Sequence, residues 1–130
     1  MTSTYQLDRS GSVPLRFQGE QIAAADGEEW QRRRHECTIY RTAAGKLVAG
    51  LDFISEWGAE VGYSQAFIGD ERDGLVAQLL AHDPAAHAFG YPPLPDFESR
   101  QRRLVAEVVA RYREMLEIMF ERAGWVEEIA

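Results

Sequence analysis

The sequence predicts a single α+β domain: an antiparallel β-meander of three to four strands, packed by a short helix and a long C-terminal helix. Two patterns predict this class. Apolar and polar residues alternate along several segments before residue 70, which is the period of half-buried strands. Apolar residues then recur at spacings of three and four in the last third, as in an amphipathic helix. A chain of 130 residues, 45% of them hydrophobic, can bury one core without disulfides.

The predicted sheet covers residues 13–69. Residues 1–12 are polar and turn-rich, although Tyr5 and Leu7 could open a further strand. The segment after Gly45 is apolar on both faces, which predicts a central strand covered by a helix. The strand segments are rich in β-branched, aromatic or alternating apolar residues. They are residues 13–18, 35–42, 47–57 and 61–68.

Two helices follow the predicted sheet. Leucine and valine spacing predicts a short helix over residues 70–82, which a proline-rich loop over residues 83–95 separates from the next element. The long helix is predicted over residues 96–123, because its apolar stripe is continuous and Gly124 is a natural C-terminal stop.

Composition excludes several classes of protein. No apolar run approaches the roughly 18 residues of a membrane span, and the first residues lack a basic-then-apolar signal segment. The one cysteine, Cys37, allows no internal disulfide, so we expect a cytoplasmic protein. The net charge of −7 argues against general nucleic-acid binding, because phosphate contacts need Lys and Arg.

The excess negative charge lies in the middle third of the chain. Residues 52–98 hold 9 acidic and one basic side chain, whereas the segments before and after them are nearly neutral. Such clustering can steer a basic partner, although carboxylates on solvated turns and at a helix start would give the same count. Trp57 is a candidate apolar anchor, with core packing as the alternative. The predicted partner-binding residues are Asp52, Glu56, Trp57, Glu60, Asp70, Glu71 and Asp73.

Three pairs of reactive residues lie close together in the sequence or in the predicted sheet. His35 and Cys37 would share one face of a strand, as a base and a nucleophile would, but nothing supplies an orienting group or an oxyanion site. His82 and His87 are too few ligands for a metal site. Asp52 could meet Glu36 across a hairpin and do acid–base work. We therefore assign no catalytic residue, metal or cofactor, and favour a non-enzymatic protein.

Residues 38–49, with the sequence TIYRTAAGKLVA, are followed by Trp57. This hairpin resembles one found in small uncharacterised proteins of bacterial plasmids, phages and other mobile elements. Small acidic proteins of that class are often inhibitors of host defence, anti-CRISPR proteins among them. The resemblance implies no activity and no functional residue, and 13 arginines against one lysine fit a GC-rich source.

The leading hypothesis is a protein-binding module or inhibitor. Its acidic surface would dock on a basic partner, such as the nucleic-acid groove of a defence or DNA-processing complex, and compete with nucleic acid there. One alternative is a small-ligand or catalytic module with a pocket between sheet and helix, built from Tyr40, Tyr63, His35 or Tyr112. Another is a structural homodimer through the long helix and Trp125.

Overall fold

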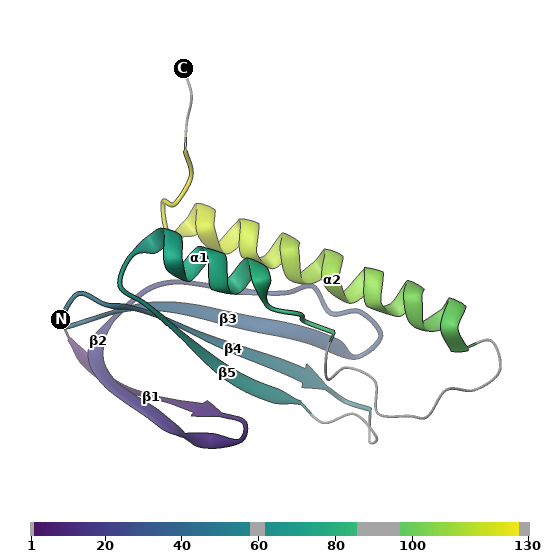
Figure 1. The fold of residues 1–130 in the computed structure, drawn as a ribbon, viewed down its shortest axis with the longest axis horizontal. Helices are drawn as coiled ribbons and strands as arrows, with labels where there is room; N and C mark the ends of the chain where they lie inside the picture. The colour runs from purple at the N-terminus through teal and green to yellow at the C-terminus, as the bar shows by residue number, and fades with distance from the viewer. Residues whose placement is uncertain (1, 58–61, 86–96, 128–130) are drawn as a thin grey trace.

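A computed structural model describes residues 2–57, 62–85 and 97–127 of the chain. They form an α+β fold in which a five-stranded antiparallel meander is followed by two helices (Figure 1). The class, the meander and the long C-terminal helix are as the sequence predicts. The strands are β1 (Ser3–Arg9), β2 (Ser12–Asp26), β3 (Arg33–Thr42), β4 (Leu47–Ser55) and β5 (Tyr63–Gly69). The helices are α1 (Arg72–Ala81) and α2 (Phe97–Arg122).

The predicted count of three to four strands is wrong, because the N-terminal residues form β1. Gly11, at a positive φ of 76°, turns β1 into β2, so the sheet begins ten residues before the predicted boundary at residue 13. Only Tyr5 and Leu7 supply the apolar face of β1, which therefore gives a weak alternation signal. The register of β1 and β2 places these two side chains beside Phe17 and Leu15.

Strand β2 is long because it pairs with two different neighbours. Its first half pairs with β1 and its second half pairs with β3, and the two halves meet at Gly19. A Cβ atom at Gly19 would lie 2.2 Å from the backbone oxygen of Arg41, so only glycine fits where the strand changes partner. A bulge between Gln21 and Ala23 adds to the bend.

Both helices cover one face of the sheet (Figure 1). Alternate residues of β3 and β4 point toward the helices and are buried. The residues of β4 on the other face are buried or half-buried as well, as expected for a segment that is apolar on both faces. Leu75 and Leu79 of α1 and the apolar stripe of α2 complete this core. Its largest fully buried members are Ile39, Leu51, Leu75, Leu79, Tyr112, Met115, Leu116 and Met119, and Phe53 is buried beside Tyr63 in a second, smaller cluster.

The hairpin of β1 and β2 covers part of the opposite face. Tyr40 of β3 is 8% exposed and points away from the helices, and its ring lies 4.6 Å from that of Tyr5 and 5.2 Å from that of Phe17. A Cβ atom at Gly50 would lie 3.2 Å from Leu7, so this glycine leaves room for the curled hairpin. The sheet is therefore packed on both faces.

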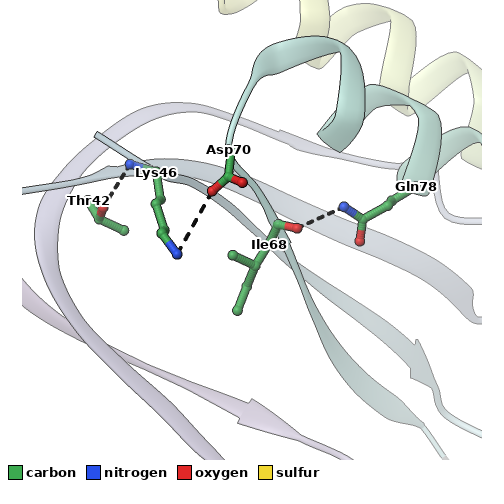
Figure 2. A network of polar contacts seen from close by, with 5 residues as sticks. All are labelled: Thr42, Lys46, Ile68, Asp70 and Gln78. Carbon is green, nitrogen blue, oxygen red and sulfur yellow. Dashed lines mark hydrogen bonds and ion pairs between the residues drawn. The ribbon is translucent and has the colours of Figure 1, made fainter. Parts of the chain in front are cut away.

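The two edge strands approach each other at one point. The backbone N–H of Ser10 donates to the Ser64 carbonyl at 2.7 Å, and the Ser64 N–H donates to the Ser10 hydroxyl at 2.9 Å. Further along β5, the side-chain amide of Gln78 in α1 donates to the Ile68 carbonyl at 2.8 Å (Figure 2). These bonds fasten β5 to the hairpin on one side and to α1 on the other.

Candidate functional site

The antiparallel register sorts the predicted site residues to different places along the sheet. The chain leaves β4 at Ser55 and leaves β5 at Gly69, and these two residues lie at opposite ends of the β4–β5 pair. At about 3.3 Å per residue, nine residues of β4 separate the ends by roughly 25 to 30 Å. We name the two ends by their charges: the arginine end holds Arg32, Arg33 and Trp57, and the acidic end holds Asp70, Glu71 and Asp73.

The acidic end keeps three of the predicted residues together. Asp70, Glu71 and Asp73 are exposed where β5 turns into α1. The Asp70 carboxylate lies 3.8 Å from Lys46 Nζ (Figure 2), and their side chains are 85% and 59% exposed. Asp73 accepts from its neighbour Arg72 at 3.2 Å. Both pairs are open to solvent, so their charges remain available to a partner.

Helix α2 brings further carboxylates to the acidic end. Helices α1 and α2 run antiparallel (Figure 1), and the Tyr112 hydroxyl and the Arg113 guanidinium of α2 donate to the Leu79 and Leu80 carbonyls of α1 at 2.5 and 3.1 Å. The last turns of α2 therefore lie beside the first turn of α1. Glu117 and Glu121 are exposed there and, among the described residues, neither has an ion-pair partner.

Trp125 joins the two groups of carboxylates. Its ring stacks on Phe120 with centroids 6.2 Å apart, and its backbone N–H donates to the Phe120 carbonyl at 2.8 Å. The residue lines two surface hollows. One is shared with Glu117 and Glu121, and the other with Arg41, Glu71, Arg72 and Asp73. The acidic end is thus a continuous surface from α1 to α2 with a half-buried tryptophan at its centre.

The remaining predicted residues lie elsewhere. Glu56 and Trp57 are exposed at the arginine end, and Glu60 lies outside the described residues. Asp52 is half-buried in the middle of β4, on the face away from the helices, where it accepts from the Ser64 hydroxyl at 2.5 Å. The register does place Asp52 opposite Glu36, but Glu36 is paired with Arg34 at 3.2 Å.

Trp57 at the arginine end is held by its own chain. Its indole N–H donates to the Gln31 carbonyl at 2.7 Å, and the Arg32 and Arg33 guanidinium carbons lie 5.8 and 5.6 Å from its ring centroid. Gln31 and Arg32 have positive φ values of 48° and 62°. They form a two-residue hairpin turn between β2 and β3, closed by backbone hydrogen bonds in both directions between Trp30 and Arg33.

A cluster of histidine and tyrosine rings lies between the sheet and the helices, near the arginine end. The Tyr63 hydroxyl is 2.9 Å from His82 Nε2 and 3.4 Å from His35 Nε2. The ring of Tyr112 lies 5.2 Å from that of His35 and 5.7 Å from that of His82. Three of the four residues weighed for a pocket therefore meet, and their rings pack against one another. Tyr40 does not join them because it points to the other face.

Burial suppresses ionisation in this region. Burial and, to a smaller extent, the charge of nearby His82 lower the pKa of His35 from 6.5 to about 4, although a hydrogen bond to the Pro84 carbonyl acts in the opposite direction. Burial also raises the pKa of the Cys37 thiol to about 12, with a smaller contribution from Asp52. The pKa values of Tyr63 and Tyr112 are likewise raised by burial. His35 and Cys37 share a face as predicted, but the thiol is protonated at neutral pH and is a poor nucleophile.

Among residues 2–57, 62–85 and 97–127, no three His, Cys, Asp or Glu side chains are placed to hold a metal ion. In the same part of the chain, no helix is both long and apolar enough to cross a membrane. No protein-family model, curated protein or solved structure matches this chain.

Proposed function

We propose that this protein is a non-enzymatic binding module that docks its acidic end on a basic surface of a partner protein. The observation that carries the proposal is the gathering of carboxylates from α1 and α2 around Trp125. Four basic side chains lie at the same end and offset most of this charge: Arg41, Lys46, Arg72 and Arg122. The carboxylates are Asp70, Glu71, Asp73, Glu117 and Glu121.

The charge and the tryptophan serve different parts of binding. Exposed carboxylates raise the rate of encounter with a basic surface, and this effect weakens as salt screens it. Tryptophan supplies apolar contact area at the centre of an interface, where truncations cost most affinity. Basic surfaces rich in Lys and Arg commonly bind nucleic acid, so competition with nucleic acid for such a surface is the mechanism that we propose.

Two variants, each with three charge reversals, are compared to test the proposal. The acidic-end variant is Asp73→Lys, Glu117→Lys and Glu121→Lys. The control is Glu28→Lys, Glu29→Lys and Glu56→Lys, which reverses three exposed carboxylates near the arginine end. Both variants change the net charge from −7 to −1, so only the position of the change differs.

Wild type and both variants are immobilised on a resin and incubated with a bacterial lysate. The proteins that wild type captures are identified and purified for affinity measurements. We expect the control to retain the partner and the acidic-end variant to lose it by at least tenfold in Kd. Affinity for wild type should fall steeply with added salt. Equal losses for the two variants, or a partner that wild type binds independently of salt, would show that the acidic end is not the docking surface.

A homodimer through the long helix stays a prediction of the sequence. Two copies that met symmetrically at Trp125 would bring Glu117 and Glu121 close to their counterparts, and like charges in contact disfavour association. Sedimentation velocity over a concentration series measures this directly, and a dimer at low micromolar concentration would compete with the docking proposal.

A further inference from the structure

The docking proposal does not use the buried histidine–tyrosine cluster, which has its own geometry. Tyr63 of β5 has its hydroxyl oxygen between two imidazoles, His82 Nε2 at 2.9 Å and His35 Nε2 at 3.4 Å. The carbonyl of Pro84 lies 3.4 Å from the same oxygen. His35 belongs to the sheet, whereas His82 and Pro84 directly follow the last turn of α1. The hydroxyl therefore ties the end of α1 to β3 and β5.

The hydrogen-bond arrangement depends on neutral imidazoles. A tyrosine hydroxyl donates one hydrogen bond and accepts others, and each neutral imidazole has one N–H donor and one acceptor nitrogen. Tyr63 can then donate to one ring and accept from the other. When both rings are protonated, both nitrogens become donors to one oxygen and two positive charges lie on either side of it.

Most of the surroundings of His35 oppose a positive charge, and the Pro84 carbonyl, which forms a hydrogen bond with the imidazole, is the exception among the causes that shift its pKa. His35 is 4% exposed, and its ring lies 4.9 Å from Phe53 of β4 and 5.2 Å from Tyr112 of α2. Arg33 of β3 and Arg111 of α2 line the same small hollow as His35, and Cys37 is the next buried residue on its face of β3. Among the described residues, the Asp83 carboxylate adds to the effect of burial in raising the pKa of Tyr63, and it accepts from the Ala85 N–H at 3.0 Å.

His82 gives protons a route to the cluster. It is half-exposed and lies at the C-terminal end of α1, where a positive imidazole is favoured by the helix carbonyls. His35, which is packed behind Tyr63, is then protonated next to a His82 ring that already carries a positive charge. Its lowered pKa agrees with this order.

We propose that His35, Tyr63 and His82 form an acid-sensitive latch that holds the C-terminal end of α1 on the sheet and releases it when both imidazoles are protonated. Release separates His82 and Pro84 from β5, exposes Tyr63 and Phe53, and loosens the last turn of α1, whose Leu79 and Leu80 carbonyls accept from Tyr112 and Arg113 of α2 in the closed state. The opening is local, because the hydrogen bonds between β3 and β4 are not involved.

Hydrogen exchange read by mass spectrometry tests the latch at pH 7 and pH 5, with rates corrected for intrinsic exchange. We expect the α1 amides of wild type to lose at least tenfold more protection at pH 5 than those of β3 and β4. The variant His35→Phe keeps an aromatic ring beside Phe53 and Tyr112 but cannot be protonated. It should keep the protection of α1 unchanged between the two pH values.

Two further variants test the latch if His35→Phe does not fold. His82→Gln, at the half-exposed ring, should weaken the pH effect, because the charge of His82 is the smaller of the two causes that lower the pKa of His35. Tyr63→Phe should expose α1 already at pH 7 because the bridging oxygen is gone. The latch is excluded if wild-type α1 is equally protected at both pH values, or if β3 and β4 lose protection as much as α1. It is also excluded if the histidine variants respond to pH as wild type does.

Discussion

The two ends of the sheet each present a tryptophan, but they use it differently. At the arginine end, Trp57 donates to Gln31 and lies under two guanidinium groups, so its polar and π interactions are satisfied within the chain. At the acidic end, Trp125 lines two hollows whose carboxylates remain solvated. The exposed fraction alone would suggest the opposite roles, because Trp57 is 44% exposed whereas Trp125 is half-buried.

This difference separates stability from recognition. Contacts that are complete within the fold contribute to the free energy of unfolding, whereas charges left without a partner contribute to encounter with another molecule. Changes at the arginine end should therefore lower stability, and changes at the acidic end should leave it nearly unchanged. The predictions below test this division, beginning with the largest effect.

The largest effect should come from His35. Its pKa is about 4 in the folded protein and 6.5 when unfolded, so the unfolded chain takes up the proton first as pH falls. The stabilisation is complete above pH 6.5 and is lost between pH 6.5 and 4, by about 3 kcal/mol. Urea denaturation at several pH values should show this loss in wild type, with a smaller slope in His35→Phe. Parallel pH profiles for the two proteins would contradict the assignment.

At the same end, Trp57→Phe should lower the free energy of unfolding by about 1–2 kcal/mol. The variant keeps an aromatic ring between the arginines but loses the N–H donor to the Gln31 carbonyl, whose turn holds a strained backbone. Chemical denaturation measures the change. The matched control is Val13→Thr at a side chain that is 73% exposed, where the stability should stay within about 0.5 kcal/mol of wild type.

At the acidic end, Glu121→Lys should raise the free energy of unfolding by about 0.3–1 kcal/mol. Glu121 lies in the last turn of α2, where the helix carbonyls favour a cation over a carboxylate. Thermal and urea denaturation at low ionic strength measure the gain. A loss of stability would mean that Glu121 has a stabilising role in the fold, and the division between the two ends would fail there.

The smallest effect should come from Lys46→Met. The ion pair with Asp70 is 3.8 Å long between two solvated side chains, so its removal should change stability by less than about 0.5 kcal/mol. Denaturation in low and high salt measures it. The Thr42 hydroxyl accepts from the backbone N–H of Lys46 at 3.0 Å and is unaffected by this change, so the hairpin turn should persist.

The sequence predicts the part of the fold whose pattern is local. Strands β3, β4 and β5 and both helices carry their own periodicity, because one side of each is buried against the core. Strand β1 does not, since its two apolar residues pack against the curled sheet and the strand is otherwise solvated. The strand count therefore fell short by one or two.

Sequence alone predicts only the part of the candidate site whose residues lie in a single turn of the chain. Asp70, Glu71 and Asp73 are neighbours in sequence and remain neighbours in space. Glu56 is separated from them because β5 crosses the length of the sheet in between. Glu117 and Glu121 lie in a segment with no net charge, and only the antiparallel arrangement of α1 and α2 brings them to this end (Figure 1).

The bonds along β5 bear on how the protein behaves in a crowded cell. An edge strand invites strand addition by another copy, which begins with its unpaired N–H and carbonyl groups. On β5 the outward-facing positions Ser64 and Ile68 already have partners in Ser10 and Gln78. Between them, only Ala66 of β5 has both its backbone N–H and its carbonyl directed outward without a partner. One residue is too short a template for the addition of another strand. A side-chain amide and a serine thus protect this edge against fibre formation without a charged residue on it.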